Sequence, residues 1–179
     1  MVMNRRLLRL ATAALTPLAL ATSACSQSSQ VDSSERDEVG QVVEGGDVGV
    51  FLLQESDCIR LPTDIGSTEV EQIEDVRAIP CAEPHDGEVV LVDDGYFNDT
   101  EVFPGEDEAV DQGTDSCIAA LDEYTGTDYD TSSFDAIVLV PSEQSWTVLD
   151  DRGLICIGLT LDEAQTDSID TTGSIRAGG

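Results

Sequence analysis

The number and placement of the cysteines limit the possible folds of this chain more than any other feature. Five are present, namely Cys25, Cys58, Cys81, Cys117 and Cys156. The first directly follows an apolar leader, and the other four are spread over the rest of the chain. Four cysteines that remain in an exported domain indicate two disulfides. No C-x-x-C spacing occurs, which favours structural disulfides over redox or metal-binding thiols.

Residues 1–24 have the pattern of a secretory signal peptide. They contain three arginines and no acidic residue, an apolar stretch from Leu10 to Ala21, and the small residues 22–24. The apolar stretch has about 12 residues, too few for a transmembrane helix, which needs roughly 20. Small residues directly before a cysteine resemble a lipobox and predict cleavage before Cys25, followed by its acylation. Thr22 departs from the usual leucine, and the alternative is ordinary secretion with cleavage nearby.

Acylated Cys25 would make lipid the anchor of the chain on the extracytoplasmic face of the cell membrane. Two or more acyl chains suffice for stable attachment, because each buried methylene contributes about 0.8 kcal/mol. No later segment is apolar over a length that spans a bilayer. The parity of the cysteines supports this prediction, since a purely secreted form would carry an unpaired thiol.

The four remaining cysteines allow three pairings. We favour Cys58–Cys81 together with Cys117–Cys156, because each of these bonds joins neighbours along the chain. In the chain-entropy model, loops of these lengths stabilise a fold by roughly 3–4 kcal/mol each.

The charge balance excludes whole classes of partner. The chain has 37 acidic residues against eight arginines and no lysine, and its net charge is −29. All the acidic residues follow the leader, which contains three of the arginines. Such a surface repels nucleic acid and anionic lipid headgroups, so no nucleic-acid partner is predicted. Solubility and tolerance of salt are the favoured explanation, and weak divalent-cation binding or a basic partner is the alternative.

Composition divides the mature chain into three parts. Residues 25–48 comprise the lipidated cysteine and a segment rich in Ser, Gln, Gly and acidic residues, which predicts a disordered tether. Residues 49–161 have the composition of a folded domain. Residues 162–179 are again acidic and end in Arg-Ala-Gly-Gly, and we predict a disordered tail there.

A helix from Glu106 to Tyr124 is the clearest predicted element. Pro104-Gly105 precede it, and three acidic residues in its first turn favour the helix dipole. Apolar or small residues recur at three- and four-residue steps on one face, namely Val110, Gly113, Cys117, Leu121 and Tyr124. Gly126 fits the C-terminal end of the helix. A disulfide from Cys117 to a strand would therefore fix the helix to a sheet.

Five short segments have the composition of strands. They are Val50–Leu53, Val76–Pro80, Glu88–Val92, Phe134–Val140 and Leu154–Leu161. The last two are continuous apolar runs, which predict central strands covered on both faces. With the helix, they predict an α+β domain in which a small antiparallel or mixed sheet packs against one main helix, stapled by two disulfides.

Several short motifs lie in order over residues 54–159, together with the four cysteines. They are Asp57-Cys58, Pro80-Cys81-Ala82-Glu83-Pro84-His85-Asp86-Gly87, Phe103-Pro104-Gly105, Pro141-Ser142-Glu143-Gln144-Ser145-Trp146 and Asp151-Arg152. In these motifs the chain resembles the septum formation domain of actinobacterial membrane and lipid-anchored proteins. The resemblance implies a link to cell division but no chemistry for particular residues. Ser56 and Asp150 stand where the family usually has glycine, which affects local turn geometry.

Three residues are candidates for a binding surface. His85, the only histidine, lies in a polar turn beside Asp86, where a structural hydrogen bond is favoured over general-base catalysis. Trp146, the only tryptophan, either anchors a core or loop or belongs to an exposed partner surface. Arg152 either pairs with an acidic neighbour or binds a carboxylate of a partner. No residue is assigned a catalytic role.

No metal or cofactor is predicted. One histidine and four cysteines committed to disulfides leave too few ligands for zinc. Calcium accepts oxygen ligands alone, but the acidic clusters at Asp93-Asp94 and at Asp128 and Asp130 lack the glycine and glutamate of an EF-hand loop. The sequence also lacks a nucleophile elbow, a phosphate-binding loop and a dinucleotide fingerprint.

The favoured function is a non-enzymatic, lipid-anchored binding module of the cell envelope. Its partners would be membrane lipid through Cys25 and an unidentified envelope protein or cell-wall component, and its link to septum formation rests on the family resemblance. One alternative is a cell-wall hydrolase that uses carboxylates, with or without His85. Another is an acidic surface protein that binds cations.

Overall fold

The computed structural model describes residues 31–62 and 73–178. The predicted signal peptide and Cys25 lie outside these residues. The elements, in chain order, are β1 (Glu35–Arg36), β2 (Val42–Glu44), β3 (Gly46–Gly49), η2 (Val50–Leu52), β4 (Cys58–Arg60), β5 (Asp75–Ile79), β6 (Gly87–Asp93), α1 (Glu106–Thr125), η3 (Tyr129–Thr131), β7 (Phe134–Leu139), α2 (Glu143–Val148) and β8 (Leu154–Thr160).

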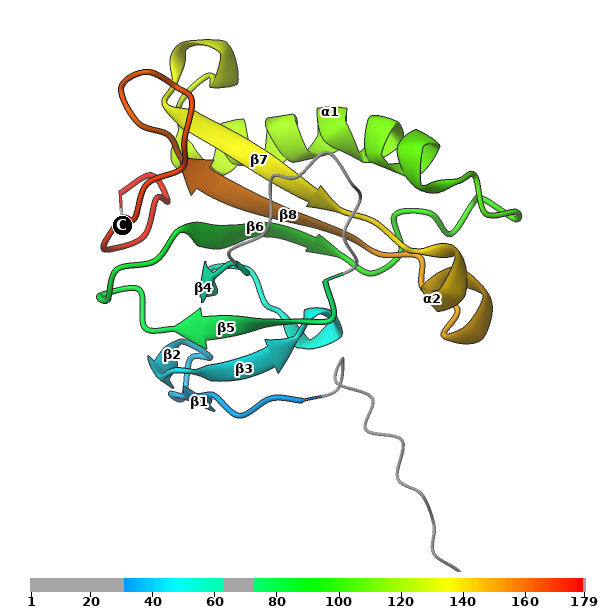
Figure 1. The fold of residues 1–179 in the computed structure, drawn as a ribbon, viewed down its shortest axis with the longest axis horizontal. Helices are drawn as coiled ribbons and strands as arrows, with labels where there is room; N and C mark the ends of the chain where they lie inside the picture. The colour runs from blue at the N-terminus through cyan, green and yellow to red at the C-terminus, as the bar shows by residue number, and fades with distance from the viewer. Residues whose placement is uncertain (1–30, 63–72, 179) are drawn as a thin grey trace, which may run out of the picture.

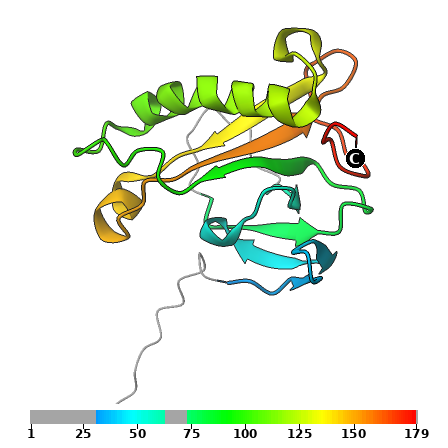
Figure 2. The same cartoon turned by 180° about the vertical axis from the view of Figure 1, so that it is seen from behind.

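The strands β3 to β8 form one six-stranded sheet in the order β3-β5-β4-β6-β8-β7, and all its pairings are antiparallel. The strands β1 and β2 form a separate hairpin. Helix α1 crosses one face of the sheet over β6, β8 and β7 (Figures 1 and 2). This arrangement confirms the predicted α+β fold with one main helix. None of the helices in the described ranges combines the length and the apolar character that a membrane crossing requires.

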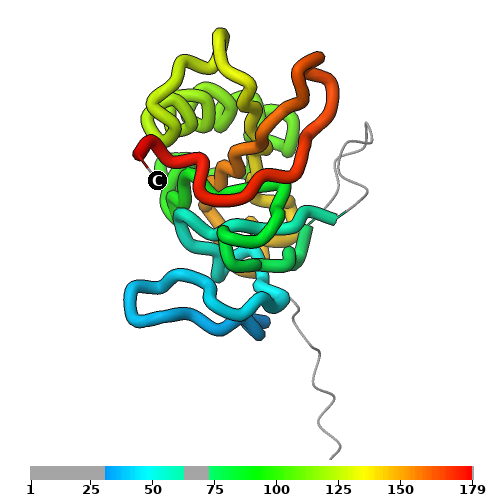
Figure 3. Tube along the Cα trace, turned by 90° about the vertical axis from the view of Figure 1, so that its left-hand side faces the viewer, coloured from blue at the N-terminus to red at the C-terminus, as the bar shows by residue number. Residues whose placement is uncertain are grey.

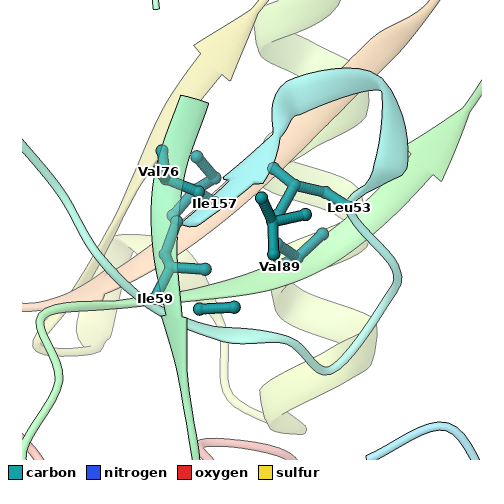
Figure 4. Close-up of a cluster of buried hydrophobic side chains, with 7 residues drawn as sticks. Leu53, Ile59, Val76, Val89 and Ile157 are labelled. Atoms are coloured by element: carbon teal, nitrogen blue, oxygen red, sulfur yellow. The ribbon is translucent and has the colours of Figure 1, made fainter. Parts of the chain in front are cut away.

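A compact apolar cluster covers the face of the sheet opposite α1 (Figure 4). It joins strands from both halves of the sheet, and its members include Leu53, Ile59, Val76, Val89 and Ile157. Alternate residues of β8 divide between the two faces, since Ile157 belongs to this cluster and Cys156 belongs to the cluster under α1. The sheet is therefore buried on both sides in its centre.

Helix α1 agrees closely with its prediction. It begins at Glu106, and Gly126 follows its end in the left-handed conformation with φ 67°, where the absence of a side chain removes the steric cost. Gly113 brings the helix near the sheet, because an added Cβ would lie 2.7 Å from Leu154 Cδ1. The disulfide between Cys117 and Cys156 joins α1 to β8, and the second disulfide joins Cys58 to Cys81, so the favoured pairing is confirmed.

Two predicted strands differ from the structure. The segment predicted as a strand at Val50–Leu53 contains the single-turn helix η2, and the strand β3 comes just before it. The strand β7, predicted to be central, lies at the edge of the sheet. Its continuous apolar run has a physical reason, because Ile137 packs against the cluster opposite α1 while Val138 packs against the cluster under α1.

The folded unit is longer than the predicted limits of residues 49 and 161, first at the N-terminal side. Residues 35–48, predicted as disordered tether, contain β1, β2 and all of β3 except its last residue. The side chain of Arg36 reaches the buried carboxylate of Asp57, to which it donates two hydrogen bonds. A buried ion pair of this kind orders a segment whose composition alone predicts disorder, and the described fold therefore includes residues from position 31 onward.

The predicted tail also packs on the domain. Thr171 and His85 exchange backbone hydrogen bonds, and Gly173 N donates to Cys81 O over 2.6 Å. Ile175 contacts the apolar cluster under α1. Figure 3 shows this C-terminal segment, in red, lying across the strands beside the end of the helix. The prediction of a disordered tail therefore differs from the structure, because long-range contacts hold the segment.

Candidate functional site

The structure brings Trp146 and Arg152 together at one end of the sheet. The short helix α2 presents Trp146, and a capping box starts the helix, in which Ser142 Oγ accepts from Ser145 N while Ser145 Oγ accepts from Ser142 N. Ser145 Oγ also donates to Asp151 over 2.8 Å, which ties the helix to the loop that carries Arg152. The segment around Trp146 is therefore a short capped helix.

The guanidinium of Arg152 stacks over the indole ring of Trp146, 3.7 Å from the ring centroid. Its Nη1 also donates to the backbone oxygens of Trp146 and Asp151, over 3.2 and 2.7 Å. The ring centroids of Phe97 and Phe103 lie 6.1 and 5.5 Å from that of the indole. Trp146 is consequently buried and anchors the loops, and does not form the exposed surface considered from the sequence.

Three exposed aliphatic side chains belong to the segments that hold this anchor. Val148 is the last residue of α2, Leu149 follows it, and Val102 directly precedes Phe103, whose ring contacts Trp146. Their exposed fractions are 69%, 47% and 77%, in the order Val148, Leu149 and Val102. We call these three residues the α2 patch. The exposed residues that flank them in the sequence include four acids, namely Asp99, Glu101, Glu143 and Asp150.

His85 lies elsewhere, at the end of the turn that leads into β6. Its side chain is buried, and Nδ1 lies 2.9 Å from the carbonyl oxygen of Glu83. The hydroxyl of Thr171 lies 3.4 Å from Nε2. The structure therefore gives His85 the hydrogen-bonding position that was favoured from the sequence, and it separates this residue from the α2 patch.

Glu88 is a buried acid that the sequence analysis did not single out. Its carboxylate accepts hydrogen bonds from the hydroxyls of Tyr124 and Ser174 and from the backbone N–H of Ile175. Three donors satisfy a carboxylate that would otherwise be costly to bury. Burial, together with the hydrogen bond to Glu88, raises the pKa of Tyr124. This network connects β6, α1 and the C-terminal segment.

Three potential metal ligands are close together in the described residues. Ligand atoms of Cys58, His85 and Glu88 lie within 4.8 Å of one another, and all three residues are buried. The sulfur of Cys58 is bonded to Cys81, however, and a disulfide sulfur is not the thiolate that binds zinc. The oxidised chain thus offers two ligands here, fewer than the three or four of a protein zinc site.

The acidic clusters considered for calcium form turn caps. Asp93 Oδ1 accepts from Gly95 N over 3.0 Å, and Asp128 Oδ1 accepts from Asp130 N over 3.1 Å. Asx turns of this type are a structural use of these side chains.

Two departures from the family pattern now have a geometric explanation. Ser56 and Asp150 both have positive φ, 74° and 56°, which a non-glycine residue adopts only at a steric cost. Glycine at these positions would meet the same turn geometry without that cost. The polar residues that sequence reasoning missed were Arg36, Asp57 and Glu88. Asp57 lies within a quoted motif, which was the one available signal for it.

The comparisons with known proteins support the sequence resemblance. The family model described as septum formation matches residues 56–178, which include α1, the sheet from β4 onward, both disulfides and the C-terminal segment. No curated protein and no solved structure matches the chain significantly. Because the match covers more than half of the sequence, the chain belongs to the septum formation family.

Proposed function

We propose that this protein is a lipid-anchored binding module of the cell envelope that takes part in septum formation. The family match supports a role in cell division or the envelope. The leader and the cysteine that follows it support export and attachment through Cys25. The observation that carries the binding role is the α2 patch, where three aliphatic side chains are exposed on a rigid aromatic anchor.

Attachment at Cys25 would hold the module close to the membrane. The described fold begins at Val31, whose carbonyl oxygen accepts a hydrogen bond from Gly49 N. Six residue steps between Cys25 and Val31 extend to about 20 Å at most. The partner is therefore expected to be reached within a few tens of ångströms of the lipid surface.

The charges around the patch favour a partner with basic residues beside apolar ones. The acids that flank the patch would attract such a surface and repel an acidic one. The central apolar side chains would supply the contact that excludes water. We therefore propose a basic, amphipathic segment of another envelope protein as the partner.

Site-directed photo-crosslinking in the native host tests the binding surface. A photoreactive residue replaces Val148, and a matched control replaces Val39, which is 80% exposed and lies between β1 and β2. We expect a defined crosslinked protein from position 148 and not from position 39. Adding Leu149→Asp should abolish that product, whereas Val43→Asp should leave it unchanged. Equal labelling from both positions, or none from position 148, would contradict a binding role for this patch.

Localisation tests the anchor and the septal role separately. A fusion that fluoresces outside the membrane is compared with its Cys25→Ala form in dividing cells. Enrichment at midcell that the Cys25→Ala form loses supports both parts of the proposal. Uniform membrane labelling rejects the septal role and leaves the anchor, and release of both forms into the medium rejects the anchor.

A further inference from the structure

The two disulfides differ in their access to solvent. Cys117 and Cys156 are both fully buried between α1 and β8. In the other bond Cys58 is fully buried, but Cys81 lies in the turn after β5 and is partly exposed. Disulfides open by in-line attack of a thiolate on one sulfur, so the rate depends on access to that sulfur. Cys81 is therefore the most exposed of the four cysteines.

The surroundings of the two bonds differ as well. Cys117 and Cys156 belong to an apolar cluster with Val90, Leu121 and Leu154. Around Cys58, by contrast, an imidazole and a carboxylate approach within 4.8 Å of the sulfur and of one another, and both are buried. A thiolate released from Cys58 would thus form next to groups that exchange protons.

The hydrogen bonds of His85 leave one nitrogen suited to proton transfer. Nδ1 lies 2.9 Å from the carbonyl oxygen of Glu83, which accepts hydrogen bonds and cannot donate them. The neutral imidazole therefore carries its hydrogen on Nδ1, and Nε2 holds the lone pair. The described contact of Nε2 is the long one, 3.4 Å from the hydroxyl of Thr171. A backbone carbonyl that fixes the tautomer in this way prepares Nε2 to accept or return a proton.

We propose that Cys58–Cys81 is a thiol–disulfide exchange site that accepts electrons from a dithiol. A thiol of the dithiol loses its proton to Nε2 of His85, and its sulfur attacks Cys81 Sγ. The bond to Cys58 breaks, its electron pair leaves with Cys58 Sγ, and His85 returns the proton to that sulfur. The second thiol of the dithiol then attacks the dithiol sulfur bonded to Cys81, and its proton passes to the departing Cys81 Sγ, so the dithiol becomes a disulfide and the protein gains two electrons and two protons. This inference is independent of the proposed binding function.

Opening of this bond would act on the C-terminal segment. The turn from Cys81 to Gly87 carries the carbonyl of Cys81, which accepts from Gly173, and the backbone of His85, which pairs with Thr171. The exchange site is therefore linked to the docking of residues 171–173. Reduction should raise the hydrogen exchange of that segment while the centre of the sheet stays protected.

Timed reduction of the folded full-length chain with dithiothreitol, quenched by alkylation and read by mass spectrometry, tests the proposal. Cys117–Cys156 is the control within the same molecule. We expect Cys58–Cys81 to open roughly tenfold faster or more, because one of its two cysteines is partly exposed. The variant His85→Gln keeps a donor for Glu83 O but lacks the basic nitrogen, and it should slow the opening of Cys58–Cys81 alone. Opening of both bonds at one rate, or an unchanged rate in His85→Gln, would overturn the proposal.

A pair of cysteine variants checks the direction of attack. Cys58→Ala leaves Cys81 as a free thiol, and Cys81→Ala leaves Cys58. With oxidised glutathione as the probe, we expect rapid formation of a mixed disulfide at Cys81 in the first variant and slow formation at Cys58 in the second. Circular dichroism establishes that each variant is folded. Equal rates in two folded variants would show that Cys81 is not the entry point.

Discussion

Arg36 and Asp57 form a bidentate ion pair that joins the N-terminal hairpin to the start of β4. Arg36 Nη1 and Nη2 donate to the two carboxylate oxygens over 2.5 and 2.9 Å. Asp57 also accepts from the backbone N–H of Gln54. The hydrogen bond to Asp57 raises the pKa of Arg36, so the guanidinium stays charged at any physiological pH. Because the pair is buried, breaking it would leave an unpaired charge in the domain.

Removing Arg36 should therefore destabilise the domain strongly. We expect Arg36→Ala to lower the free energy of unfolding by about 3–5 kcal/mol, since Asp57 would remain buried without its partner. Arg77→Ala is the matched control, because Arg77 pairs with Asp47 at the surface, where such a pair contributes about 1 kcal/mol or less. Urea denaturation measures both. Similar losses in the two variants would mean that the buried pair has no special role.

The raised pKa of Tyr124 predicts a loss of stability at high pH. Burial and the hydrogen bond to Glu88 favour the neutral phenol, so its pKa in the folded chain lies above the value near 10 in the unfolded chain. The associated stabilisation is complete below about pH 10 and is lost as the pH rises toward the folded pKa. Unfolding should be measured between pH 8 and about 11.5 for the wild type and for Tyr124→Phe.

Tyr124→Phe should show a weaker decline over that alkaline window. Tyr129→Phe is a useful comparison, because the pKa of Tyr129 is also raised, chiefly by its hydrogen bond to Asp135, and this residue is more exposed. We expect the pH effect of Tyr129→Phe to be the smaller of the two. If the stability of the wild type and of Tyr124→Phe declined equally with rising pH, Tyr124 would not be the cause of the alkaline loss of stability.

Short sequence patterns predicted the elements that depend on residues close together in the chain. The helix from residue 106 follows from one periodic apolar face and a terminal glycine, and the disulfide pairing follows from the order of the cysteines. The N-terminal hairpin could not be predicted in this way, because a pair 21 residues apart orders an acidic, serine-rich segment. The C-terminal segment is similar, since Ser174 and Ile175 contact a residue 86 and 87 positions away.

The sequence indicated individual residues of the candidate site, but it did not indicate how they contact one another. Trp146 and Arg152 were both selected, yet nothing local in the sequence predicts that one stacks on the other. His85 was selected for its chemistry, whereas the acid near it, Glu88, appeared as the first residue of an expected strand. A charged side chain is expected to be exposed. The burial of Glu88 depends on three hydrogen-bond donors from distant segments.

Glu88 should be sensitive to loss of its charge. In Glu88→Gln one acceptor oxygen becomes a donor, so either Ile175 N loses its acceptor or the hydroxyls of Tyr124 and Ser174 must turn to accept, which should lower stability by about 1–3 kcal/mol. Glu83→Gln, at an exposed position in the turn before β6, should stay within about 0.5 kcal/mol of the wild type. Thermal unfolding compares them, and limited proteolysis should cut the C-terminal segment of Glu88→Gln faster. A neutral Glu88→Gln variant would argue against the network.

Arg152 should be needed to shield the single tryptophan. In Arg152→Ala the stacked guanidinium and two hydrogen bonds to backbone oxygens are lost, and water reaches the indole of Trp146. We expect the fluorescence emission to shift to longer wavelength and stability to fall by about 1–2 kcal/mol. Arg152→Lys should recover part of the stability, because a lysine retains the charge but not the planar stack. An unchanged emission maximum would mean that the phenylalanine rings, and not Arg152, keep water away from the indole.

Asp150 and Ser56, two of the residues with positive φ, should respond differently when each is changed to glycine. Asp150→Gly should raise stability by about 0.5–1 kcal/mol, because it removes a steric cost and loses only a pair between Arg152 and a carboxylate that is 91% exposed. Ser56→Gly relieves a similar cost, but it deletes the hydroxyl that donates to the Tyr124 hydroxyl and accepts from Arg176. We therefore expect Ser56→Gly to be neutral or destabilising, although both changes restore the usual family residue. Calorimetric unfolding of the two variants measures the contrast, and a stabilised Ser56→Gly would mean that backbone conformation outweighs the hydroxyl contacts.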